Sequence, residues 1–104
     1  MKTDTMKNIT TTPFQERVYA ICRKIPRGKT MTYGEIAKIL ESSPRAVGQA
    51  LKRNPYAPIV PCHRVIHTDG RIGGYNGIKD SKKKIKLLKQ EGVRIIDGAI
   101  VKND

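Results

Sequence analysis

Three helix-start signals follow one another in the first half of the chain. Thr12-Pro13-Phe14-Gln15 and Thr32-Tyr33-Gly34-Glu35 each place a threonine three residues before a Gln or Glu that can return the capping hydrogen bond. Ser43-Pro44 joins a serine cap to a proline at the first helical position. The sequence therefore predicts three short helices, the last of which ends at Asn54-Pro55.

Each predicted helix has one apolar face. The residues expected to point inward are Phe14, Val18, Ile21, Cys22 and Ile25, then Ile36, Ala37, Ile39 and Leu40, then Ala46, Val47, Ala50 and Leu51. The residues expected to point outward from the third helix are Arg45, Gln49, Lys52 and Arg53. Two short helices joined by a tight turn, the second basic on its outer side, have the outline of a helix-turn-helix. An ordinary helical hairpin with a solvated charged face fits this pattern equally well.

The second half of the chain has a different residue pattern, with more prolines and glycines between its apolar segments. Residues 56–66 carry a proline on each side of Ile59-Val60, which predicts a rigid extended segment without regular pairing. A glycine-rich loop is expected over residues 73–77, and a last helix from Asp80 or Ser81 to Gln90-Glu91, with its lysines mostly outward. Asp97-Gly98 predicts a small terminal hairpin.

The expected fold class is mainly helical with short strands. Residues 12–104 should form one winged-helix-like helix-turn-helix domain with a small terminal hairpin, after a loosely held lead over residues 1–11. A chain of 104 residues leaves no room for a nucleotide-cofactor domain. It also contains no run approaching the roughly 18 to 20 apolar residues that a membrane helix needs, and no secretory leader, so we expect no membrane contact and a place in the cytoplasm.

The charge balance points to a polyanionic partner. The chain has 21 Lys and Arg against 9 Asp and Glu, a formal net charge of +12. So many cations on a small surface attract nucleic acid, although a merely soluble basic surface or contact with an acidic membrane would also agree with the composition.

Cys62 is the candidate for covalent chemistry. It stands between Pro61 and His63 and is followed by Arg64, where an imidazole and a guanidinium could favour the reactive thiolate. A buried, inert cysteine is the plainer alternative, and it is the one expected for Cys22 on the inner face of the first helix. On an extended chain His63 would point away from Cys62, so it could act only across a kink or through a water. A metal site built from Cys62, His63 and His67 is disfavoured because no CxxC or HxxxH spacing supports it.

The segment Pro61-Cys62-His63-Arg64-Val65 resembles the active-site signature of the O6-alkylguanine-DNA alkyltransferases, which repair DNA by direct reversal of damage. Further matches follow in the family's order over residues 32–37, 45–51, 53–55, 74–77 and 91–92, so the likeness extends over residues 14–92. The resemblance implies a monomer whose partner is double-stranded DNA containing O6-alkylguanine or O4-alkylthymine. The second helix of the helix-turn-helix would enter the minor groove and the damaged base would be flipped into a pocket.

The resemblance also implies the chemistry and its residues. Cys62 would accept the alkyl group irreversibly, without metal or cofactor, so that each protein molecule reacts once. His63 would be the base acting through a water, and Glu91 would orient and charge it. Asn54 would brace the turn before the active site.

The same resemblance assigns the contacts with DNA. Arg45 would fill the gap left by the flipped base, and Tyr33 would crowd the neighbouring phosphate. The other expected DNA contacts are Gln49, Lys52 and Arg53, and the residues expected to line the guanine pocket are Val65, Tyr75, Asn76 and Gly77.

The chain departs from the usual pattern of this family in two ways. Family members usually carry an additional N-terminal α/β domain, whereas this chain resembles the catalytic half alone. In addition, Ile78 follows Gly77 where many members have a second glycine.

Two other functions are considered. The first alternative is an alkyltransferase-like protein, which flips alkylated guanine without transfer. Such proteins typically lack the signature cysteine that stands here at position 62. The second, a plain helix-turn-helix regulator, leaves the Cys62 signature and Tyr75 unexplained.

Overall fold

The computed structural model describes residues 11–56, 59–73 and 82–101. The lead expected over residues 1–11 and the loop expected over residues 73–77 lie outside this part of the chain, apart from Thr11 and Gly73. The elements, in chain order, are α2 (Pro13–Arg23), β1 (Met31–Thr32), α3 (Tyr33–Leu40), α4 (Pro44–Lys52), η1 (Cys62–Arg64), β2 (Val65–Ile66), α5 (Lys82–Gln90), β3 (Ile95–Ile96) and β4 (Ala99–Ile100). Within the described residues, no helix has the length and apolar character needed to cross a membrane.

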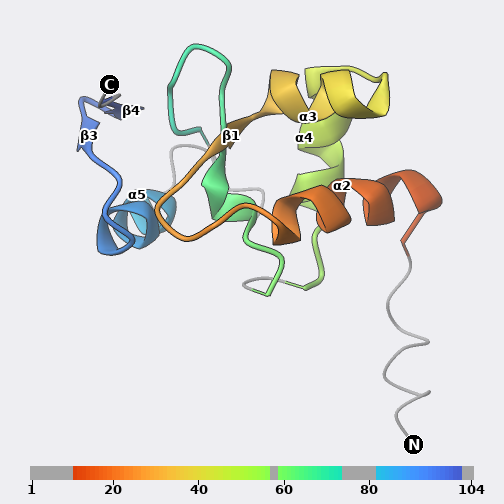
Figure 1. The fold of residues 1–104 in the computed structure, drawn as a ribbon, viewed down its shortest axis with the longest axis horizontal. Coiled ribbons are helices and arrows are strands. Elements are labelled where there is room, and N and C mark those ends of the chain that lie inside the picture. Colours follow the sequence, from red (N-terminus) through yellow and green to blue (C-terminus); the bar gives the residue numbers. More distant parts are fainter. Residues whose placement is uncertain (1–10, 57–58, 74–81, 102–104) are drawn as a thin grey trace, which may run out of the picture.

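The elements form two groups. Figure 1 shows α2, α3 and α4 together on one side of the β1–β2 pair, and α5 with the β3–β4 hairpin on the other. The predicted fold class, mainly helical with short strands and a terminal hairpin, is confirmed.

All three predicted helix starts are confirmed. The Thr12 hydroxyl accepts a hydrogen bond from the Gln15 N–H at 3.1 Å, and the Gln15 side chain accepts one from the Thr12 N–H at 3.0 Å. Thr32 and Glu35 exchange the same pair of bonds at 3.0 and 2.8 Å. The Ser43 hydroxyl accepts from a backbone N–H in the first turn of α4 at 3.1 Å. Each cap stabilises its helix by about 1 kcal/mol.

The main core lies between α2, α3, α4 and the segment around η1. Its buried residues are Val18, Tyr19, Cys22, Ile25, Ile36, Ala37, Val47, Ala50, Leu51, Val60, Cys62 and Val65. One residue predicted to lie in this core, Ile39, is instead 60% exposed. The inward stripe of α3 runs through Tyr33, Ile36, Ala37 and Leu40, at spacings of three and four residues, and Ile39 falls outside this stripe.

A smaller core lies beneath α5 and the terminal hairpin, built on Ile66, Ile72 and Leu88. The predicted hairpin is confirmed: Ile95 pairs with Ile100 across a turn at Asp97-Gly98, where both φ angles are positive, at 52° and 76°. Gly92, with φ of 90°, ends α5 as predicted.

The extended segment was predicted to lack regular pairing, and this is wrong in two respects. It turns through the 3-10 element η1 at Cys62, and it then pairs in parallel with β1, with Met31 opposite Val65 and Thr32 opposite Ile66. Each strand has only two residues, too few to show a period of two in the sequence. The pairing places the start of α3 beside the residues that follow Cys62.

Candidate active site

The Cys62 thiol is buried but has polar groups around it. The residue opens η1 and is only 5% exposed. Burial raises the pKa of this thiol, and a hydrogen bond from the Asn54 side chain and the charge of Lys84 act against the rise. Cys22 differs, since burial and, to a smaller extent, the nearby Cys62 together raise its pKa to about 12 with no such opposition. Of the two thiols, Cys62 therefore has the surroundings of a nucleophile.

His63 and Arg64 both contact Glu91 at the end of α5. His63 Nε2 lies 2.9 Å from Glu91 Oε2, and Arg64 donates to both oxygens of the same carboxylate, from Nε at 2.9 Å and Nη2 at 2.8 Å. The Arg64 hydrogen bond, together with His63, lowers the pKa of Glu91 to about 2. A third bond, from Arg64 Nη1 to the Ile25 carbonyl at 2.8 Å, ties this cluster to the end of α2.

Burial lowers the pKa of the His63 imidazole below its ordinary value and outweighs the opposite effect of Glu91. The neutral ring is therefore favoured near neutral pH, and the carboxylate fixes its orientation. With Nε2 donating to the carboxylate, Nδ1 carries the lone pair that can accept a proton.

The expected source of thiolate stabilisation is therefore wrong in one respect. Arg64 was predicted to favour the Cys62 thiolate, but the 3-10 turn directs its guanidinium to Glu91 and to the Ile25 carbonyl. The charged group that favours the thiolate is Lys84.

Lys84 was predicted to lie mostly outward with the other lysines of α5, and it is completely buried. Its Nζ donates to the Val65 carbonyl at 2.6 Å and lies 5.8 Å from the centre of the Tyr33 ring. Burial lowers the pKa of its ammonium to about 8. A signal for it exists in the sequence, because Lys84 stands four residues before Leu88 and seven before Glu91, on one helical stripe.

Replacing Lys84 with methionine is expected to make Cys62 less reactive. Loss of the ammonium raises the pKa of the thiol, so the pH profile of its alkylation by iodoacetamide should move to higher pH, most clearly below about pH 8, where Lys84 is charged. Lys86→Met, at an exposed position of the same helix, is the matched control. Equal profiles for the two variants would contradict this role for Lys84.

Asn54 closes the turn that leads from α4 to η1. Its Nδ2 donates to the Val60 carbonyl at 3.2 Å, and its Oδ1 accepts from the Tyr56 N–H at 2.9 Å. The Tyr56 hydroxyl in turn donates to Glu16 of α2 at 2.8 Å. This turn holds the Asn54 amide where it can also reach the Cys62 sulfur.

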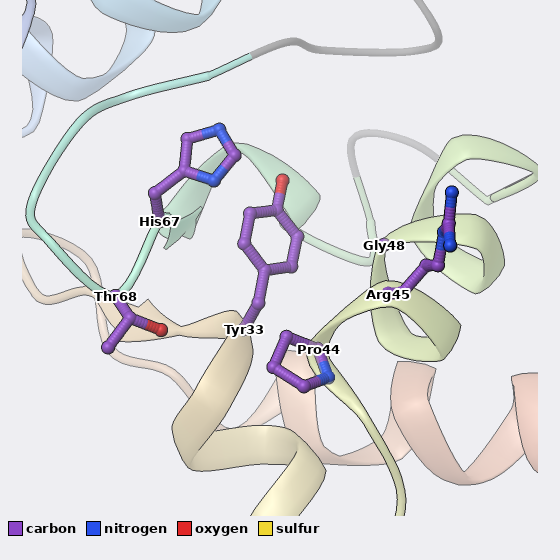
Figure 2. Close-up of a pocket in the computed structure, with 6 residues that line it drawn as sticks. All are labelled: Tyr33, Pro44, Arg45, Gly48, His67 and Thr68. Atoms are coloured by element: carbon purple, nitrogen blue, oxygen red, sulfur yellow. The ribbon is translucent and has the colours of Figure 1, made fainter.

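A pocket of about 320 Å³ opens beside the start of α4, lined by Tyr33, Pro44, Arg45, Gly48, His67 and Thr68. Figure 2 shows the Tyr33 ring in the middle, with His67 and Thr68 on one side and the α4 residues on the other. The rings of Tyr33 and His67 are 5.3 Å apart, centre to centre. Lys84 lies near the Tyr33 ring, which lines the pocket, and its charge lowers the pKa of the Cys62 thiol. This one lysine therefore lies beside both the pocket and the thiol.

The other predicted DNA-binding residues lie on the outside of α4 or, in the case of Arg53, at its C-cap. Arg45, Gln49, Lys52 and Arg53 are all exposed, as predicted. Val65, expected at the guanine pocket, has a fully buried side chain, while Tyr75, Asn76 and Gly77 lie outside the described residues. In the part of the chain that the structure describes, Cys62, His63 and His67 do not form a metal-binding group.

Comparison with known proteins gives consistent matches. The family described as 6-O-methylguanine DNA methyltransferase, DNA binding domain, matches residues 13–93. A methylated-DNA--protein-cysteine methyltransferase of Thermococcus sibiricus is 53% identical over 85 residues, which are 81% of this chain and 47% of the relative. The chain thus spans about half the length of the curated relatives that it matches.

Two solved structures extend the comparison. The O6-methylguanine-DNA methyltransferase of Pyrococcus kodakaraensis strain KOD1 has a TM-score of 0.71 and 50% identity, covering 80% of this chain and 48% of its own. S. pombe Atl1, solved in complex with damaged DNA containing O6-carboxymethylguanine, has a TM-score of 0.76 and 34% identity, covering 91% of this chain and 93% of its own.

Proposed function

Because the chain belongs to the 6-O-methylguanine DNA methyltransferase family, we propose that it repairs DNA by moving an alkyl group from O6 of guanine irreversibly to Cys62. The observation that carries the proposal is the surroundings of the Cys62 thiol. Asn54 and Lys84 act on its sulfur, and the next residue is a neutral His63 held by Glu91.

The proposed reaction is a displacement at the alkyl carbon. The Cys62 thiol passes its proton through a water to His63, a bond forms between the sulfur and the alkyl carbon, and the bond from that carbon to guanine O6 breaks. Guanine leaves with the electron pair of that bond and takes up at its ring the proton that His63 received, so no proton is gained or lost overall. The resulting thioether is stable, so one protein molecule repairs one lesion and no cofactor takes part.

The proposed DNA-binding surface is the exposed side of α4 with the pocket at its start. Arg45 lies in the first turn of α4 and lines the pocket beside Tyr33. We assign Arg45 to the gap left by the flipped base, and Tyr33 to the neighbouring phosphate. Gln49, Lys52 and Arg53 continue the exposed side of this helix and would meet the DNA backbone.

The decisive experiment mixes the protein with a duplex containing O6-methylguanine and measures the intact mass of the protein. A gain of one methyl group supports the proposed transfer. A second candidate function, binding of the damaged base without transfer, is favoured by the similarity to S. pombe Atl1 over nearly the full length of both chains. Tight binding of the modified duplex with no gain in mass would establish this second function.

Arg45→Ala is expected to slow transfer from duplex DNA much more than transfer from the free base O6-methylguanine. Base flipping costs a few kcal/mol of unstacking, and if the guanidinium returns about 1.4 kcal/mol of it, the duplex rate falls about tenfold. The free base has no stack to break, so its rate should change little.

Lys52→Ala is the matched control, an exposed cation further along α4. It should weaken DNA affinity at all sequences and lower the salt slope by about 1, with little effect on the transfer step. Equal losses by Arg45→Ala on both substrates would show that Arg45 supports the pocket or the fold instead.

A further inference from the structure

Tyr56 is held against α2 by three contacts of its side chain. Its hydroxyl donates to Glu16 Oε2 at 2.8 Å, and its ring meets the ring of Tyr19 edge-on, with 5.6 Å between the centres. The Arg23 guanidinium lies over the Tyr56 ring, 5.5 Å from its centre. All three partners belong to α2, so the turn between α4 and η1 is fixed to a helix outside that turn.

Glu16 is a charged acceptor for the Tyr56 hydroxyl. The same carboxylate oxygen also accepts a hydrogen bond from the Thr11 hydroxyl, at 2.5 Å. These two hydrogen bonds lower the pKa of Glu16, so this side chain is ionised at neutral pH. Hydrogen bonds to an ionised acceptor are about twice as strong as those between neutral groups. The hydroxyl is therefore the polar anchor of Tyr56, distinct from the packing of its ring.

The backbone of Tyr56 determines which end of the Asn54 amide faces the thiol. The Tyr56 N–H donates to Asn54 Oδ1 at 2.9 Å, so the amide nitrogen is directed away from Tyr56. One N–H of this nitrogen donates to the Val60 carbonyl at 3.2 Å, and the second can donate to the Cys62 sulfur. A reversed amide would place a carbonyl oxygen near the sulfur, where its lone pairs would repel a thiolate.

We propose that Tyr56 is a positioning residue for the Cys62 thiol and acts through Asn54. Fixed to α2 by its side chain, Tyr56 holds its own N–H against the Asn54 oxygen and so keeps the donor end of that amide on the sulfur. The inference rests on the proposed function, because it takes Cys62 as the nucleophile of alkyl transfer. It adds to that function a control of the thiol from Glu16 on α2.

Alkylation of Cys62 by iodoacetamide, followed over a range of pH and located by peptide mass mapping, tests the proposal without DNA. Tyr56→Phe removes the hydroxyl and keeps the ring. The pH profile of this variant should move upward by about half a pH unit, so that the rate well below the midpoint falls about threefold. The rate at high pH, where the thiol is fully ionised, reports the access of the reagent to the sulfur and should stay the same.

Tyr19→Phe is the matched control. It also loses one hydroxyl hydrogen bond, from Tyr19 to the Ala50 carbonyl at 2.7 Å, but that bond joins α2 to α4 and not to the turn. This variant should melt at a lower temperature and keep the wild-type pH profile. Apart from Tyr19 itself, the titratable groups around the thiol are the same in both variants: Cys22 of α2, Tyr33 of α3, His63 of η1 and Lys84 of α5.

Glu16 supplies a second test of the same contacts. Glu16→Gln keeps a side-chain oxygen that can accept from the Tyr56 hydroxyl, so this variant should keep the wild-type pH profile. Glu16→Ala should shift the profile as far as Tyr56→Phe does. The double variant should shift it no further, because both changes break the same hydrogen bond.

Four results would overturn the proposal: a wild-type profile for Tyr56→Phe, a change confined to its rate at high pH, an equal shift for Tyr19→Phe, or shifts of Tyr56→Phe and Glu16→Ala that add in the double variant. Methyl transfer from O6-methylguanine DNA is measured separately on the wild-type protein. Absence of transfer would count against the proposed function, and the iodoacetamide profiles would still decide the role of Tyr56.

Discussion

Cys62→Ala is expected to abolish methyl transfer from O6-methylguanine DNA, and Cys22→Ala to leave transfer intact. Both residues are buried, but only Cys62 has Asn54 and Lys84 acting on its sulfur, while the pKa of Cys22 is raised to about 12. Without the sulfur no acceptor remains, so the expected loss is complete. Mass mapping of peptides after the reaction shows which cysteine carries the methyl group.

Two controls make this result specific. Cys62→Ala should still bind duplex DNA, because the exposed residues of α4 are unchanged. Cys22→Ala leaves a small cavity in the main core, so it should melt at a lower temperature while it keeps its activity. A methyl group found on Cys22, or transfer by Cys62→Ala, would refute the assignment of the nucleophile.

Glu91→Gln is expected to affect both stability and transfer. The carboxylate, 8% exposed, holds Arg64 and His63 at once, and its loss leaves a largely buried guanidinium without its counter-charge. The expected loss of stability is on the order of 3 kcal/mol. Transfer should slow as well, because the His63 ring loses the acceptor that fixes its orientation.

The acid dependence of stability gives an independent test of Glu91. Its pKa of about 2 lies below the ordinary value of 4.5, so its contribution is complete above about pH 4.5 and is lost as the pH falls toward 2. Glu91→Gln should therefore lose less stability than the wild type over that interval. Glu35→Gln, which alters only the cap of α3, is the control and should keep the wild-type acid profile. A wild-type profile for Glu91→Gln would contradict the ion pair with Arg64.

The features that could be predicted from the sequence are those formed by neighbouring residues. Thr12 and Thr32 cap helices through residues three positions away, and Asp97-Gly98 forms its turn locally. The β1–β2 pair could not be predicted, because it joins Met31 to Val65 and each strand is too short to show a pattern. The exposure of Ile39 depends on which side of α3 meets α4, and an apolar run alone does not determine this.

The features of the candidate site also differ in whether they could be predicted from the sequence. Cys62 could be selected from its neighbours in the chain, whereas the approach of Glu91 to His63 came from the family resemblance and has the expected geometry at 2.9 Å. The direction of Arg64 could not be predicted, because it depends on the 3-10 turn that follows Pro61. The burial of Lys84 was missed because a lysine among lysines is ordinarily solvated, even though its spacing to Leu88 marks it as inward.

The position of Cys62 within the main core bears on the lifetime of the protein after it has reacted. The sulfur belongs to the same packed cluster as Val60, Val65 and the inner side of α4. Close-packed interiors do not accept extra atoms freely, and one added carbon typically costs about 1 to 3 kcal/mol in overpacking. A domain of this size has a small free energy of unfolding, so the alkylated chain should unfold locally more often than the unreacted one. It should therefore dissociate from DNA sooner. The burial that raises the pKa of the Cys62 thiol before the reaction would then also promote release of the alkylated protein from the repaired site.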